Sequence, residues 1–95
     1  MIAPLFRIED TPDNKYMVKI HFDTYSVRTE GSYNVIAAHL LGIKYSDYLR
    51  LCRDEFGATL SGKNSMYVVA KFKQREDCRK LVDFLNIKWR QTQGE

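Results

Sequence analysis

The side chains that most often bind metals or act as nucleophiles are few and widely spaced in this sequence. Its two cysteines, Cys52 and Cys78, lie 26 residues apart, and its two histidines, His21 and His39, lie 18 residues apart. Structural zinc sites usually draw on ligand pairs about two to five residues apart, so this spacing argues against one. No glycine-rich phosphate loop and no Ser–His–acid grouping is evident. We therefore expect no metal, no cofactor and no catalysis, and a function in binding.

Charge gives the first indication of a partner. The 95 residues include 15 Lys and Arg and 12 Asp and Glu, a formal net charge of +3. The excess is concentrated in residues 44–80, which hold nine basic and five acidic residues. A basic segment of this kind favours an anionic partner, although an ordinary solvated surface can have the same balance.

Residues 35–53 carry the most informative pattern, that of a helix-turn-helix. Two helices that cross closely need a small residue in the first, which Ala38 supplies, and their tight turn needs a residue that tolerates a positive φ, which Gly42 supplies. Ser46 is suited to cap the second helix. The apolar positions of the pattern are filled by Ala37, Leu41, Ile43, Tyr48 and Leu51.

With the segment that follows it, this pattern resembles a known family. Residues 35–86, read as a helix pair, a hairpin and an amphipathic helix, resemble excisionase-type winged-helix proteins. The resemblance implies that the second helix enters the major groove of DNA and that the hairpin loop contacts phosphates as a wing. A shorter stretch, GIKYSDYLRLCRDEFGA, also resembles small uncharacterised proteins of phages and prophages, which implies an origin rather than an activity.

The helix-turn-helix interpretation names the residues that would contact DNA. Arg50 is the best candidate to read guanine, because its guanidinium can bond O6 and N7 together. Tyr45 would pack on a sugar, or else be a half-buried turn residue, and Ser46 would face base edges. The candidates for phosphate contacts are Lys44, Arg53 and Lys63. Carboxylates on the same helix would oppose phosphates, and these are Asp47, Asp54 and Glu55.

The composition indicates one folded domain to position these residues. Hydrophobic residues make up 44% of the chain and aromatic residues 13%, which suffices for one core and is too much for a disordered chain. No apolar run approaches the roughly 18 residues of a membrane span, and no secretory signal is recognisable. Because two cysteines are too few for a disulfide scaffold, we expect a cytoplasmic protein with reduced thiols.

Periodicity predicts the elements of an α+β fold. Alternating apolar residues predict antiparallel strands in 5–28, with a third short strand near Tyr25, and helical spacing predicts the pair in 33–56, its second helix starting at Asp47. Two strand-like runs around a turn-rich loop predict a hairpin in residues 58–73. Apolar residues at helical spacing predict a C-terminal helix in residues 75–86. The expected domain thus has N-terminal strands, a two-helix corner, a hairpin and a closing helix, with a frayed tail at 91–95.

Two other binding functions remain open. The chain is also compatible with a phage-type accessory factor that binds and modulates a host protein, for which exposed aromatics would be the anchors, and with an oligomer. Alternatively, a final strand at 87–91 would complete a βαββαβ order, the ferredoxin-like arrangement of RNA-recognition domains. Tyr67 would then stack on a base, but Val69 and Lys71 stand where aromatic and glycine residues are expected.

Overall fold

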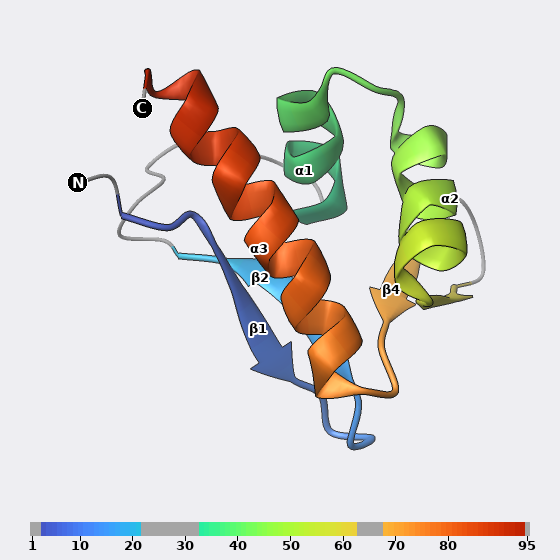
Figure 1. Cartoon of the computed structure of the whole chain (residues 1–95). Coiled ribbons are helices and arrows are strands. Elements are labelled where there is room, and N and C mark those ends of the chain that lie inside the picture. The colour runs from blue at the N-terminus through green and yellow to red at the C-terminus, as the bar shows by residue number, and fades with distance from the viewer. Residues whose placement is uncertain (1–2, 22–32, 63–67, 95) are drawn as a thin grey trace.

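The computed structural model describes residues 3–21, 33–62 and 68–94, which form two hairpins and three helices (Figure 1). This is the predicted α+β fold: N-terminal antiparallel strands, a helix pair, a second hairpin and a C-terminal helix. In chain order the elements are β1 (Phe6–Asp10), β2 (Tyr16–Ile20), α1 (Tyr33–Leu41), α2 (Tyr45–Phe56), β3 (Thr59–Ser61), β4 (Val69–Lys71) and α3 (Arg75–Thr92).

The first hairpin pairs β1 and β2 from Phe6 opposite Ile20 to Asp10 opposite Tyr16. Its turn contains Asn14 at a φ of +60°, which asparagine tolerates better than most residues. Strand formation here follows from the alternation of apolar and polar residues, as predicted. The third strand predicted near Tyr25 lies outside the described residues.

The two hairpins are joined at one point. In the second hairpin Thr59 pairs with Lys71 and Ser61 pairs with Val69. Just beyond it, the backbone N–H of Tyr16 donates to the carbonyl of Phe72 at 2.9 Å, and the N–H of Phe72 donates to the carbonyl of Tyr16 at 2.8 Å. The strands therefore follow the spatial order β1, β2, β4, β3, with a single bridge between the inner two.

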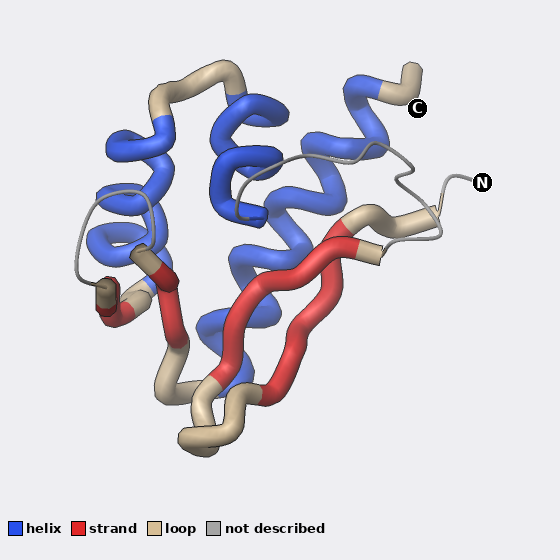
Figure 2. The backbone as a smooth tube through the Cα atoms, turned by 180° about the vertical axis from the view of Figure 1, so that it is seen from behind, coloured by secondary structure: helices blue, strands red, loops and turns tan. Residues whose placement is uncertain are grey.

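The core lies between the helices and one face of these strands. Helix α3 crosses the β1–β2 hairpin in Figure 1, and Figure 2 shows the opposite face of that hairpin with no described helix over it. The largest fully buried side chains come from strands and helices alike: Leu5, Phe6, Tyr48, Phe72, Leu81 and Leu85. None of the described helices is long and apolar enough to cross a membrane.

The predicted end of the last helix is wrong. Residues 87–91, expected to form a strand, belong to α3, which runs to Thr92 and takes in the start of the predicted tail. Asn86, a plausible helix end in sequence, uses its side chain elsewhere: its Oδ1 accepts from the N–H of Phe6 at 2.8 Å, and its Nδ2 donates to the carbonyl of Phe6 at 3.1 Å. Because the final strand is absent from this described segment, the ferredoxin-like order does not form.

The start of α2 also differs from the prediction. The helix begins at Tyr45, and Lys44 occupies the N-cap position without a side-chain capping bond, so Ser46 lies inside the helix and does not cap it. The predicted helix ends are confirmed, since Gly42 and Gly57 have φ values of +70° and +76°. These left-handed conformations favour glycine because it lacks a Cβ.

Candidate nucleic-acid interface

The turn between α1 and α2 has the compact form that the sequence predicted. The N–H of Gly42 donates to the carbonyl of His39, and the N–H of Ile43 donates to the carbonyl of Ala38, both at 3.1 Å. Ala37 and Ala38 are buried, so the small residues lie where the helices pack. Three residues connect the two helices, and α2 is thereby held at a fixed position against the core.

The inner face of α2 is apolar and closed to solvent. Tyr48, Leu49 and Cys52 are buried, whereas Leu51, the residue predicted for this face, is only half-buried. Burial raises the pKa of the Cys52 thiol to about 11 and that of Cys78 to about 12. Both cysteines are free and stay protonated at neutral pH, which fits core packing. Among the described residues no group of three or more His, Cys, Asp or Glu could hold a metal ion.

The outer face of α2 brings three of the predicted DNA contacts together. Ser46, Arg50 and Arg53 are all exposed, and their spacing of four and three residues places them on one side of the helix. We call this set the α2 stripe. Lys44, also exposed, directly precedes the helix. Four of the six predicted contact residues therefore lie at or beside one accessible face.

Each arginine of the α2 stripe is held by a neighbouring carboxylate. Arg50 forms an ion pair with Asp47, one turn earlier, and Arg53 Nε donates to Asp54 Oδ1 at 2.8 Å. The bond from Arg53 lowers the pKa of the Asp54 carboxyl. Exposed pairs of this kind contribute at most about 1 kcal/mol, so an incoming anion can replace them.

The remaining two predicted contacts have different outcomes. Tyr45 is half-buried at the start of α2, and its hydroxyl donates to the carbonyl of Val68 at 3.2 Å. The side-chain amide of Asn34 donates to the same carbonyl at 3.3 Å. Tyr45 therefore ties α2 to the chain entering β4, the role of the half-buried alternative rather than of a sugar contact. Lys63 lies outside the described residues.

A second exposed feature lies on α1 and its turn. Val35 is 45% exposed and Ile43 is 38% exposed, and both are large apolar side chains. His39 lies between them at helical spacing and is exposed. His39 also lines a small apolar pocket of about 100 Å³, together with Leu5, Ile36, Leu40 and Trp89.

The strands of both hairpins present a further set of basic residues, which is outside the set predicted from the sequence. Residues in or next to the strands that alternate with residues facing the core include three lysines and an arginine, so they point away from it: Arg7, Lys15, Lys19 and Lys71. The alternation itself was the available signal, but their grouping depends on how the two hairpins join.

No protein-family model, no curated protein and no solved structure matches the chain.

Proposed function

We propose that the chain binds duplex DNA as a small helix-turn-helix-type module, with α2 in the major groove. The observation that carries this proposal is the α2 stripe, Ser46, Arg50 and Arg53, exposed on a helix that a three-residue turn holds against the core. A major groove about 12 Å wide admits one such helix. A hairpin follows α2 directly, as a wing would.

We expect the residues at this face to divide into base contacts and phosphate contacts. Ser46 lies in the first turn of α2, the end that meets base edges in helix-turn-helix proteins, and Arg50 lies one turn further, in the middle of the helix. The long side chain of Arg50 would reach a base edge from there. Its guanidinium would exchange Asp47 for O6 and N7 of a guanine. Arg53 and Lys44 would contact phosphates, which sets the register of the helix without reading sequence.

Binding to a duplex selected from a randomised pool tests the proposal. Arg50→Ala should cost about 1–3 kcal/mol on the selected duplex and less on a random one. Arg53→Ala should weaken both about equally and reduce the slope of log K against log salt by about one. The matched control is Arg79→Ala on α3, because Arg79 is also exposed and pairs with a carboxylate three residues earlier, Glu76. Arg79 has a second partner, Asp83, at 3.8 Å.

Two outcomes would remove the proposal. One is no binding to any duplex at about 50 mM salt, where contacts with phosphates are strongest. The other is equal loss of affinity in Arg50→Ala and Arg79→Ala, since only Arg50 belongs to the α2 stripe.

A protein partner is the second candidate, and the exposed side chains of Val35 and Ile43 favour it. Apolar anchors beside a pocket are common at protein interfaces. Val35→Ser with Ile43→Ser should then abolish capture of a specific host protein and leave the melting temperature nearly unchanged. Ile87→Ser is the control, because Ile87 is equally exposed on another helix. Equal capture by all variants would reject this candidate.

A further inference from the structure

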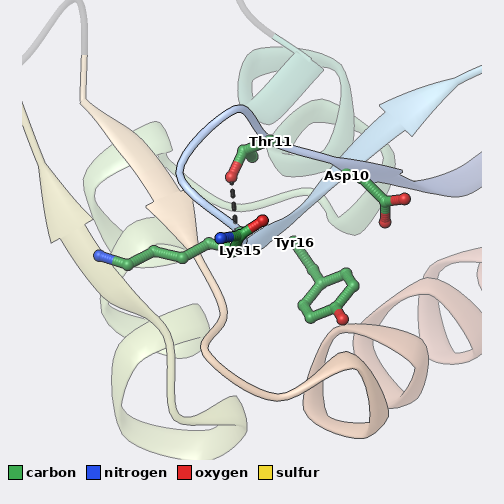
Figure 3. Close-up of a pocket in the computed structure, with 5 residues that line it drawn as sticks. Asp10, Thr11, Lys15 and Tyr16 are labelled. Atoms are coloured by element: carbon green, nitrogen blue, oxygen red, sulfur yellow. Dashed lines mark hydrogen bonds between the residues drawn. The ribbon is translucent and has the colours of Figure 1, made fainter.

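The side of the sheet that no described helix covers carries an excess of positive charge. Val18 in β2, Ala70 in β4 and Phe72 just after β4 are buried and face the core, so their neighbours in sequence point to the other side. Figure 3 shows this alternation beside a small polar pocket, where Lys15 and Tyr16 leave the strand in opposite directions and Tyr16 lies on the side of α3. We define the sheet face as the charged residues of this side, Arg7, Glu9, Asp13, Lys15, Lys19, Lys71 and Lys73. Two half-buried apolar side chains, Met17 and Val69, lie on the same side by the same alternation.

Ion pairs confirm that residues from both hairpins share this face. Glu9 Oε1 lies 3.3 Å from Arg7 Nη2, and Glu9 Oε2 lies 3.5 Å from Lys19 Nζ. Asp13 Oδ2 lies 4.0 Å from Lys15 Nζ and 3.2 Å from Lys71 Nζ. Asp13 therefore bridges the β1–β2 turn and β4.

Each carboxylate on the sheet face is thus shared by two cations. Lys73 follows the buried Phe72, is exposed, and has no carboxylate partner among the described residues. Five cations and two carboxylates leave an excess of three positive charges, equal to the formal charge of the whole chain. The other ten basic and ten acidic residues of the sequence balance each other in number.

We propose that the sheet face binds the phosphate backbone of duplex nucleic acid, without reading bases. Four of its five cations are lysines, which act as flexible point charges and need no fixed acceptor geometry. Alternate strand residues lie about 6.6–6.8 Å apart and adjacent strands about 4.8 Å apart, so the charges form a surface grid rather than a single pocket. This contact does not require α2 and goes beyond its proposed role.

A duplex fits this face better than a single strand does. Proteins that bind single strands without sequence preference stack bases on exposed aromatic side chains. Within the described residues, the sheet face has no Phe, Tyr or Trp, and Tyr16 points to the other side, toward α3 (Figure 3). Tyr67, the residue expected to stack on a base in an RNA-recognition domain, lies outside the described residues. The described part of the face therefore offers charge without a stacking surface, which favours a backbone whose bases are already paired.

The test compares two triple variants that lose the same charge from opposite sides of the molecule. Lys15→Gln, Lys71→Gln and Lys73→Gln remove three cations from the sheet face, and Arg79→Gln, Lys80→Gln and Arg90→Gln remove three exposed cations from α3. Affinity for a random duplex is measured between about 50 and 200 mM salt. Each neutralised phosphate contributes about 0.9 to the magnitude of the slope of log K against log salt. This magnitude should fall by about two to three in the sheet variant and by less than one in the α3 variant.

Equal losses in the two variants would overturn the proposal, because they would reflect net charge alone. An unchanged slope in the sheet variant would overturn it as well. The proposal would also be overturned if the sheet variant lost binding to anionic lipid vesicles but still bound duplex DNA, since the face would then bind a membrane surface. Circular dichroism melting checks the fold, and if the triple variant is unstable, Lys73→Gln alone should still lower the slope by about one.

The same measurements separate this proposal from the role of α2. If Arg50→Ala loses discrimination while the sheet variant binds as the unaltered protein does, α2 reads DNA and the sheet face proposal is wrong. If the salt dependence of duplex affinity falls in the sheet variant while Arg50→Ala leaves affinity for every duplex unchanged, the sheet face binds DNA and α2 does not. No duplex binding by the unaltered protein removes both.

Discussion

Helix α2 and the sheet face are two polar surfaces on one core, and they balance charge differently. On α2 each arginine pairs with a carboxylate one or three residues away. With Lys44 included, the helix carries three cations and three carboxylates, so its charges balance in number. On the sheet face each carboxylate serves two cations, and Lys71 reaches Asp13 from 58 residues away. A helix places partners next to each other in sequence, whereas strand pairing gathers charges from distant segments.

The difference favours different tasks. A stripe of arginines held by exchangeable carboxylates is suited to a partner that offers specific acceptors, because binding must replace each pair. An unbalanced lysine surface is suited to a uniform line of phosphates, because it attracts them at long range without fixed geometry. The two surfaces together would provide specific and non-specific contacts, and the following changes break or sharpen that contrast.

The largest effect is expected at the turn that positions α2. Gly42 has a φ of +70°, and a Cβ there would meet no atom within 4 Å, so backbone strain is the whole cost of a side chain. Gly42→Val should lower the free energy of unfolding by about 1–3 kcal/mol, as measured by denaturant titration. It should also weaken DNA binding through α2 more than binding through the sheet face.

Gly94→Val is the matched control for Gly42. Gly94 has a φ of +85° and equally open space, but it follows the end of α3, where local unwinding can relieve the strain. It should therefore cost less than Gly42→Val. An unchanged denaturation midpoint in Gly42→Val would mean that the turn does not hold α2 in the described geometry.

The next effect concerns the link between α2 and the second hairpin. Tyr45→Phe removes one of two donors to the carbonyl of Val68 and leaves the amide of Asn34 in place. The loss should be about 0.5–1.5 kcal/mol of unfolding free energy, the usual worth of one hydrogen bond. Because both donors share an acceptor, adding Asn34→Ala should cost more than the sum of the single changes. Additive costs would show that the two bonds act independently.

The helix pair and the hairpins could be predicted because their signals are local. Gly42 and Gly57 follow the ends of helices at positive φ values that favour a residue without a Cβ, and the alternation in β2 is complete within five residues. The α2 stripe follows from helical spacing once those ends are known. For these elements, propensity and pattern point to the same structure.

Features that depend on distant contacts could not be predicted from the sequence. Asn86 lies inside α3, and its side-chain amide bonds the backbone of Phe6, 80 residues away; nothing near Asn86 in sequence indicates that partner. The grouping of charges on the sheet face could not be predicted for the same reason, since the two hairpins join only at the bridge between Tyr16 and Phe72. The missed cap at Ser46 has another cause: α2 begins one residue before it and has no side-chain cap.

Neutralising carboxylates on either surface sharpens the contrast with equal charge changes. Asp47→Asn with Asp54→Asn frees both arginines of the α2 stripe, and we expect about two- to tenfold tighter binding to a selected duplex at low salt. Glu9→Gln with Asp13→Asn adds the same charge to the sheet face and should tighten binding to selected and random duplexes alike. If the two double variants gain equally on every duplex, the surfaces do not differ in function.

The smallest effect concerns the acid titration of one carboxyl from each surface. The hydrogen bond from Thr11, followed by that from Lys71, lowers the pKa of Asp13 below its ordinary value of 3.8, and the bond from Arg53 lowers the pKa of Asp54. A carboxyl with a depressed pKa in the folded state stabilises the fold above the unfolded value, and this stabilisation is lost as pH falls through the folded pKa. Both side chains are exposed, so the loss below about pH 4 should be slight.

Carboxyl chemical shifts followed by NMR between about pH 2 and 6 separate the two surfaces, because that range spans the carboxyl titrations. Lys71→Gln should raise the pKa of Asp13 toward 3.8 without moving that of Asp54, since the lysine is a partner on the sheet face only. Arg53→Gln should do the reverse. If Lys71→Gln leaves Asp13 unmoved, β4 does not contact the β1–β2 turn through this pair, and the charge that defines the sheet face would no longer be shared between the two hairpins.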